Sequence, residues 1–99
     1  MKRDLAPYFI ARITLYPTEQ GGRQSPIAED YFGCPCKFDE KNYTAWDCRI
    51  LTKDEKFYPG ETKEFGMIFL TPEAGALFRA VGKFYLWEGK IFGEAAALR

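Results

Sequence analysis

The chain has 99 residues, which is enough for one domain with one hydrophobic core. A hydrophobic fraction of 46% and an aromatic fraction of 17% exclude a disordered chain. The fourteen basic side chains are balanced by fourteen acidic ones, which argues against a strong nucleic-acid binder because such proteins carry a basic excess. We therefore expect residues 1–99 to form a single folded domain.

The N-terminal residues and the cysteine count bear on the cellular compartment. Asp4 and Pro7 interrupt the chain after Met1, so the sequence shows no apolar run of the kind found in signal peptides or membrane spans. Three cysteines are an odd number and too few for a disulfide scaffold. These features predict a reduced, cytoplasmic protein that has no membrane partner.

The first predicted element is a strand over residues 8–16, in which apolar and polar side chains alternate. Alternation with period two is typical of a strand that buries one face. The residues expected on the buried face are Phe9, Ala11, Ile13 and Leu15. Pro17 ends the strand, and a loop that contains Gly21 and Gly22 follows it.

The middle of the chain predicts three more strands. Residues 31–38 form a weaker candidate, because a glycine and a proline within them suit an edge strand or a bulge. Residues 43–51 and 62–71 alternate more clearly, and Pro59-Gly60 between them is typical of a turn in which glycine takes a positive φ. The residues expected to point inward are Trp46, Cys48, Ile50, Phe65, Met67 and Phe69.

The C-terminal third predicts one turn of helix and two strands. Thr71 can cap a helix and Pro72 suits its first position, but Gly75 argues against a longer helix. Residues 78–87 and 91–98 are the predicted strands, joined by a compact turn that contains glycine. About six strands in one small domain favour an all-β fold, either a small antiparallel barrel or a sandwich.

Residues 9–26 consist of an alternating strand followed by Gln-Gly-Gly-Arg-Gln-Ser-Pro. This stretch resembles the opening of the C-terminal β-barrel domain of elongation factor Tu, where an alternating strand precedes an acidic-Gly-Gly-Arg-His-Thr-Pro loop. Residues 59–61 and 71–72 are similar to the family's Pro-Gly-Asp turn and His-Pro, and residues 84–93 to its final hairpin. The resemblance covers residues 9–98 and implies a Greek-key barrel of about six strands.

The resemblance also implies a binding surface. In elongation factor Tu this barrel packs against the GTPase domain and contacts the T arm of aminoacyl-tRNA. The positions that match the family's loop and hairpin turn are Arg23, Gln24, Glu88 and Gly89. Gln24 replaces the family's His, and the chain has no Gly-x-x-x-x-Gly-Lys-Ser/Thr phosphate loop, so we expect no nucleotide binding.

Each of these residues has a functional and a structural interpretation. Arg23 and Gln24 can present an exposed pair of donors to a phosphate or to a carbonyl group of a partner. In the structural interpretation they belong to a turn in which Arg23 pairs with Glu19 or Glu29. Trp87, beside the hairpin turn, can stack on a base or anchor a protein interface, or it can belong to an ordinary barrel rim.

The motif Cys34-Pro35-Cys36 raises the question of a metal or a disulfide. A zinc site usually needs four nitrogen or sulfur ligands, but the chain has no His and only Cys48 in addition. A disulfide between Cys34 and Cys36 would be strained, because alternate residues of one strand do not meet well. We therefore expect buried or half-buried free thiols, with Cys48 in the core, and no metal or other cofactor.

The function predicted from the sequence is binding without catalysis. Proton transfer near neutral pH without His needs a perturbed carboxylate, Lys or Cys, and the carboxylate pairs of this chain lie in charged, turn-like segments. These pairs are Asp39 with Glu40, Asp54 with Glu55, and Glu61 with Glu64.

The preferred hypothesis is a protein–protein interaction module that uses the surface around Arg23, Gln24, Trp87 and Glu88. The role of an inhibitor or immunity protein would suit its size, and a homo-oligomer is compatible with the same surface. The alternative hypothesis is a stand-alone RNA- or tRNA-binding domain that uses the Gly-Gly-Arg loop.

Overall fold

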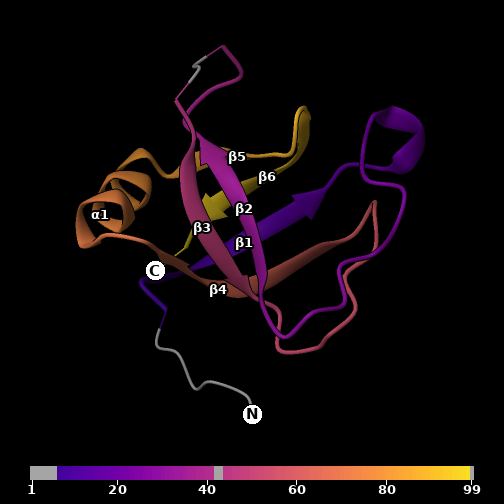
Figure 1. The fold of residues 1–99 in the computed structure, drawn as a ribbon, viewed down its shortest axis with the longest axis horizontal. Helices are drawn as coiled ribbons and strands as arrows, with labels where there is room; N and C mark the ends of the chain where they lie inside the picture. Colours follow the sequence, from indigo (N-terminus) through magenta and orange to yellow (C-terminus); the bar gives the residue numbers. More distant parts are fainter. Residues whose placement is uncertain (1–6, 42–43, 99) are drawn as a thin grey trace.

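Six antiparallel strands hydrogen-bond to one another in a closed order and form a β-barrel (Figure 1). The structure is a computed structural model that describes residues 7–41 and 44–98. The strands are β1 (Phe9–Leu15), β2 (Phe32–Lys37), β3 (Trp46–Leu51), β4 (Thr62–Phe69), β5 (Lys83–Trp87) and β6 (Ile91–Ala97).

The order of strands around the barrel is β1-β4-β3-β2-β5-β6. The consecutive strands β2, β3 and β4 are neighbours, and β5 returns to pair with β2, which is a Greek-key connection. β1 pairs with β4 on one side and with β6 on the other, so the first and last strands close the barrel. The predicted small all-β barrel is confirmed.

The inward faces of the strands form a core rich in aromatic side chains. The four residues predicted for the buried face of the first strand are all at most 2% exposed. The inward residues predicted for β3 and β4 are also buried, except that Trp46 is half-buried and packs beside Phe38 and Phe78. The period-two pattern succeeded because the strand pleat itself sends successive side chains to opposite faces.

The predicted strand bounds match β1, β2, β4 and β6 to within two residues at each end. The third predicted strand was placed at residues 43–51, but β3 begins at Trp46, and residue 43 lies outside the described residues. A larger difference concerns residues 78–82, which were predicted as the start of the fifth strand. β5 begins only at Lys83, because the residues before it belong to a helix.

The helix α1 (Pro72–Val81) is ten residues long, so the prediction of a single helical turn is wrong. Its start was predicted correctly, because Thr71 Oγ1 accepts a hydrogen bond from Ala74 N at 3.2 Å and Pro72 occupies the first turn. The helix continues through Gly75. This residue is buried against Tyr8, and a Cβ atom at this position would lie 3.0 Å from the Tyr8 ring, so glycine leaves room for that ring. The small residue lets α1 lie close to the start of β1.

Phe78 fixes α1 against the barrel. Its side chain is fully buried and lies 4.4 Å from the Phe38 ring, 4.9 Å from the Phe69 ring and 4.9 Å from the Phe84 ring, measured between centroids. These contacts connect α1 with β4, β5 and the segment after β2. Burial of a phenylalanine contributes about 1.5–3 kcal/mol, which outweighs the cost of about 1 kcal/mol for a glycine inside a helix.

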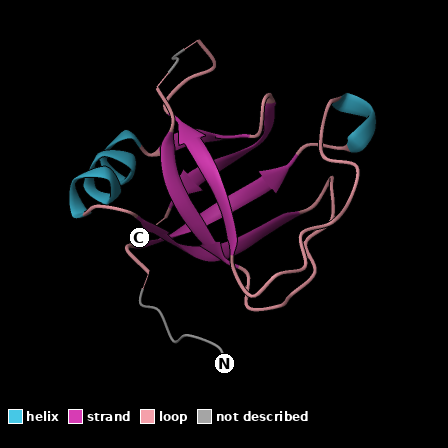
Figure 2. Cartoon of the chain, viewed as in Figure 1, coloured by secondary structure: helices cyan, strands magenta, loops and turns pink. Residues whose placement is uncertain are grey.

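In the described part of the chain two helices lie outside the barrel, α1 and the short 3-10 helix Thr18–Gln20, on opposite sides in the view of Figure 2. Among residues 7–41 and 44–98, no helix has the length and apolar character required to span a membrane. The two helices and the turns at the two ends of the barrel are the surfaces on which we looked for a binding site.

Candidate functional site

The Gly-Gly-Arg loop folds back on the end of β1. Gly22 N donates a hydrogen bond to Pro17 O at 3.0 Å, and a Cβ atom on Gly22 would lie 1.9 Å from the carbonyl oxygen of Tyr16. Only glycine fits a contact this close. Thr18 Oγ1 donates to Arg23 O at 2.6 Å and closes the loop. The loop is thus tightly held, and it fixes the direction in which Arg23 leaves the main chain.

The side chain of Arg23 turns toward the barrel. Its Nη1 donates to Glu88 Oε1 at 2.7 Å, and its guanidinium lies 4.8 Å from the centroid of the Phe32 ring and 5.8 Å from that of the Phe92 ring. Only 18% of this side chain is exposed. Charge pairing and contact with aromatic faces both stabilise this position.

The predicted pairing of Arg23 with Glu19 or Glu29 is therefore wrong. The partner, Glu88, lies 65 residues along the chain in the turn between β5 and β6. Glu19 and Glu29 are close to Arg23 in the sequence, whereas the pairing of β1 with β6 brings the distant turn before β6 beside the loop. The expectation of an exposed arginine is corrected for the same reason.

Three of the five predicted site residues meet in one cleft, which we call the loop cleft. Its volume is about 360 Å³. The residues that line it are Gly22, Arg23, Gln24, Ser25, Glu88, Lys90 and Phe92. Gln24 and Lys90 are exposed, while the charges of Arg23 and Glu88 are already paired. The cleft therefore has mixed polarity and offers an amide, an ammonium group and a satisfied ion pair.

The other two predicted residues have different positions. Gly89 forms the turn itself, with a φ of 72°, and Glu88 N donates to Lys90 O at 2.9 Å across it. Trp87 does not line the loop cleft: it is half-buried, and Lys37 Nζ lies 5.4 Å from the centroid of its ring. A register shift between Leu86 and Trp87 accompanies this placement, as a β-bulge re-aims a side chain.

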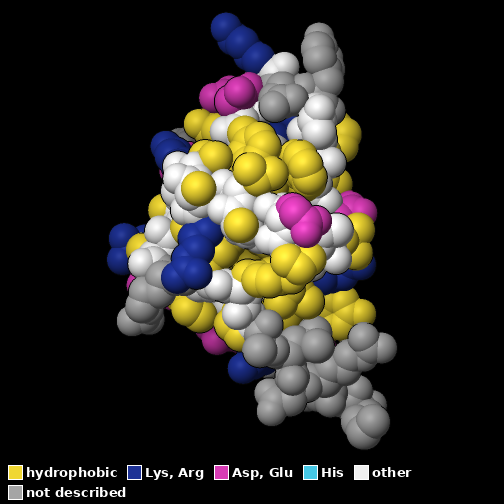
Figure 3. Space-filling model, turned by 90° about the vertical axis from the view of Figure 1, so that its left-hand side faces the viewer, with side chains coloured by type: hydrophobic (Ala, Val, Ile, Leu, Met, Phe, Trp, Pro, Cys, Tyr) yellow, Lys and Arg dark blue, Asp and Glu magenta, His cyan; other side chains and the backbone are white. Residues whose placement is uncertain are grey.

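A second surface was missed by the sequence analysis. Two large apolar side chains one turn apart on α1, Leu77 and Val81, are exposed, and so is Leu70, two residues before the helix. We call these three residues the α1 face, and their exposed fractions are 45%, 49% and 72%. Figure 3 looks onto this side of the molecule, where hydrophobic side chains gather. The available signal was the i, i+4 spacing of Leu77 and Val81, which the expected helix break at Gly75 obscured.

A hollow of about 300 Å³ lies between Tyr8 and one side of α1. Its lining is mainly apolar and is completed by Pro72, Gly75, Ala76, Arg79 and Ala80. Leu77 and Val81 are not among the lining residues. The hollow therefore lies on a different side of α1 from Leu77 and Val81.

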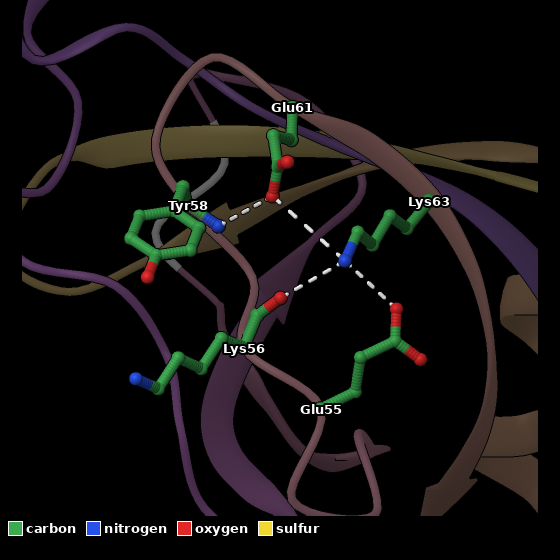
Figure 4. A network of polar contacts seen from close by, with 5 residues as sticks. All are labelled: Glu55, Lys56, Tyr58, Glu61 and Lys63. Carbon is green, nitrogen blue, oxygen red and sulfur yellow. Dashed lines mark hydrogen bonds and ion pairs between the residues drawn. The ribbon is translucent and has the colours of Figure 1, made fainter.

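The carboxylates weighed for acid–base chemistry include Glu55 and Glu61, which surround one lysine. Lys63 Nζ lies 2.7 Å from Glu55 Oε2 and 3.9 Å from Glu61 Oε1, and it donates to Lys56 O at 2.9 Å (Figure 4). Glu61 Oε1 also accepts from Tyr58 N at 2.8 Å. The hydrogen bond with Glu55 raises the pKa of Lys63, so the ammonium group stays charged. The network ties the loop before β4 to that strand.

The three cysteines come together inside the barrel as buried free thiols, and Cys48 belongs to the core as predicted. Their Sγ atoms lie within 4.8 Å of one another, and among residues 7–41 and 44–98 no carboxylate joins this group. Hydrogen bonds with Cys36 and Cys48 lower the pKa of Cys34, whereas burial raises that of Cys36. The pKa of Cys48 is raised as well, so Cys34 is the thiol of this cluster whose pKa is lowered.

Two surfaces are candidates for binding, the loop cleft and the α1 face. The loop cleft holds an ion pair that is already satisfied, whereas the α1 face exposes apolar side chains to water. No protein-family model matches the chain, and no curated protein matches its sequence.

Proposed function

We propose that the chain is a non-enzymatic protein-binding module whose main contact is the α1 face. The observation that carries this proposal is the exposure of Leu77 and Val81 on one side of α1, together with Leu70 just before the helix. Large apolar groups that gather at a surface favour association, because a partner that covers them removes apolar area from water. Burial of one such side chain contributes about 1.5–3 kcal/mol.

The loop cleft suits a supporting role in this proposal. A ligand that used the guanidinium of Arg23 would first have to displace Glu88 from a contact of 2.7 Å. Gln24 and Lys90 are exposed and can add polar contacts without that cost. Such contacts at the margin of an interface supply orientation more than affinity.

The resemblance to the elongation factor Tu barrel supports a folded protein as the partner, since that barrel packs against a GTPase domain. The same resemblance implies RNA binding through the Gly-Gly-Arg loop. A protein partner is favoured because the carboxylate of Glu88 beside Arg23 would repel a phosphate, and because the net charge of the chain is zero. An absence of catalysis is supported by the lack of His in the sequence.

The proposal is tested by substitution on each surface. Tagged protein is used to retrieve its partner from a lysate of the source organism, with size-exclusion chromatography of the pure protein to detect a second copy as the partner. Leu77→Glu should reduce the retrieved partner at least about tenfold, because it places a charge in the contact and removes burial worth more than 1.4 kcal/mol. Since Leu77 is 45% exposed, circular dichroism should show an unchanged fold.

The matched controls are Gln24→Ala in the loop cleft and Trp87→Ala on β5. Both should retain the partner. Loss of the partner in these variants but not in Leu77→Glu would assign the contact to the loop and hairpin turn instead. A monomer that retrieves no protein but binds tRNA, with an affinity that falls steeply with salt, would contradict the proposal and favour the RNA-binding alternative.

A further inference from the structure

The cysteines of β2 and β3 lie in register. Cys34 is directly opposite Cys48 in the antiparallel ladder, and Cys36 lies two residues further along β2, opposite Trp46. All three point into the barrel, with exposed fractions of 3% for Cys34, 0% for Cys36 and 1% for Cys48. These are all the cysteines of the chain. Two neighbouring strands thus place every thiol of the protein at one point in the core.

The three sulfurs are unequally spaced. The Sγ atoms of Cys36 and Cys48 are 2.6 Å apart, whereas those of Cys34 and Cys48 are 4.0 Å apart. Two thiolates bound to one tetrahedral zinc ion, each at about 2.3 Å, would lie about 3.8 Å from each other. Cys36 and Cys48 are closer than that, so a shared metal would have to push them apart. A disulfide holds its sulfurs about 2.0 Å apart, and Cys36 and Cys48 are nearer to that separation than Cys34 and Cys48 are.

We propose that Cys36 and Cys48 are a modification site, at which a hydroperoxide forms a disulfide across β2 and β3 and leaves Cys34 as the remaining thiol. This inference is independent of the proposed protein-binding function. The proposed disulfide joins Cys36 to Cys48, which are diagonal neighbours on β2 and β3. It does not join the two cysteines of the Cys34-Pro35-Cys36 motif. A disulfide, unlike a thiolate, carries no charge, so it suits the apolar surroundings of these residues.

The chemistry balances with one hydroperoxide for each disulfide. The O–O bond breaks as one sulfur takes an oxygen and becomes a sulfenic acid, and the other oxygen leaves as water or, from an organic peroxide, as an alcohol. The second sulfur attacks the first, the S–S bond forms, the S–O bond breaks, and a water leaves with the thiol proton. The two sulfurs together lose two electrons, which reduce the peroxide.

Oxidation that begins at Cys34 leads to the same product. Cys48 can condense with the Cys34 sulfenic acid over the 4.0 Å between their sulfurs. Cys36 then attacks the Cys48 sulfur, the Cys36–Cys48 bond forms, and Cys34 leaves as a thiolate. Departure of Cys34 is favoured because its pKa is the one that is lowered within the cluster.

The experiment uses the full chain, reduced and then treated with hydrogen peroxide. Thiols counted in denaturant should fall from three to one, and the mass should fall by about 2 Da relative to the reduced protein. Alkylation of the remaining thiol followed by fragmentation should place the alkyl group on Cys34. An alkyl group on Cys36, disulfide-linked dimers, or sulfinic acid without loss of two thiols would overturn the proposal.

Two variants test the pairing without depending on fragmentation. Cys34→Ser should still lose both of its thiols to an intramolecular disulfide, whereas Cys48→Ala should form none. Both variants are first compared with the wild type by circular dichroism, and the wild-type alkylation result decides the matter if either fails to fold. Purified reduced protein that holds one equivalent of metal on all three cysteines, and resists peroxide for that reason, would also overturn the proposal.

Discussion

At Arg23 the local turn could be predicted from the sequence, but the contacts of the side chain could not. The turn chemistry around it was evident from two glycines and a proline, and the structure has a tight loop there. Its charge partner could not be predicted, because Glu88 and the Phe32 ring come from other parts of the barrel. A short stretch of sequence shows only the residues next to Arg23 along the chain. Its contacts with residues far away in the sequence are set by the fold. The predicted ion-pair partner of Arg23 was therefore wrong, although the turn around it was predicted correctly.

At the same scale, Gly22 is the least replaceable position in the loop. Gly22→Ala places a Cβ atom 1.9 Å from the Tyr16 carbonyl oxygen, so main chain must move, and we expect a loss of about 3 kcal/mol in the free energy of unfolding. Gly21→Ala is the matched control: its φ is 92° but nothing lies within 4 Å of the new atom, so about 1 kcal/mol is expected. Urea denaturation measures both, and equal losses would contradict the close approach.

Among the elements, the strands were predictable and α1 was not. Alternation in β1 is visible in the sequence because successive side chains of a strand point to opposite faces, one buried and one exposed. The length of α1 depends on Phe78, which enters a group of rings contributed by distant segments, and on Gly75, which accommodates Tyr8. These contacts override the low helix propensity of glycine, and no local pattern encodes them.

The start of α1 should depend on its cap. Thr71→Ala removes the oxygen that accepts from Ala74 N, and we expect it to lower the free energy of unfolding by about 1 kcal/mol. Thr71→Ser keeps an acceptor at the same position and should stay close to wild type. Chemical denaturation with both variants measures the cap, and an equal loss in the two would show that the methyl group of Thr71 matters instead.

For the whole molecule, the count of about six strands and the all-β class followed from strand patterns and domain size, and the choice of a barrel over a sandwich followed from the resemblance to the elongation factor Tu domain. Closure depends on the pairing of β1 with β6, the two ends of the described barrel in sequence. Tyr16, just after β1, adds a side-chain link across this junction, since its hydroxyl donates to Glu94 Oε1 at 3.1 Å. The α1 face could not be predicted, because it requires both the helix and its placement on the barrel.

The junction between β1 and β6 should weaken in alkali. Burial and then the hydrogen bond with Glu94 raise the pKa of Tyr16 from 10.0 to about 12. The folded state therefore holds this proton more tightly than the unfolded state, so its stabilising contribution is complete below pH 10 and is lost as the pH rises toward 12. Thermal unfolding from pH 9 to 12 should show a smaller decline for Tyr16→Phe than for wild type. Identical declines in both proteins would refute the link.

The two sides of α1 carry separate requirements. Phe78 is buried in the barrel core. Leu77 and Val81, on the same ten-residue helix, are exposed. Under the proposed function, substitutions at the exposed positions can therefore change the partner without disturbing the rings that hold the helix. In evolutionary terms, the barrel can acquire a new partner through a few changes on one helical margin while its fold stays the same.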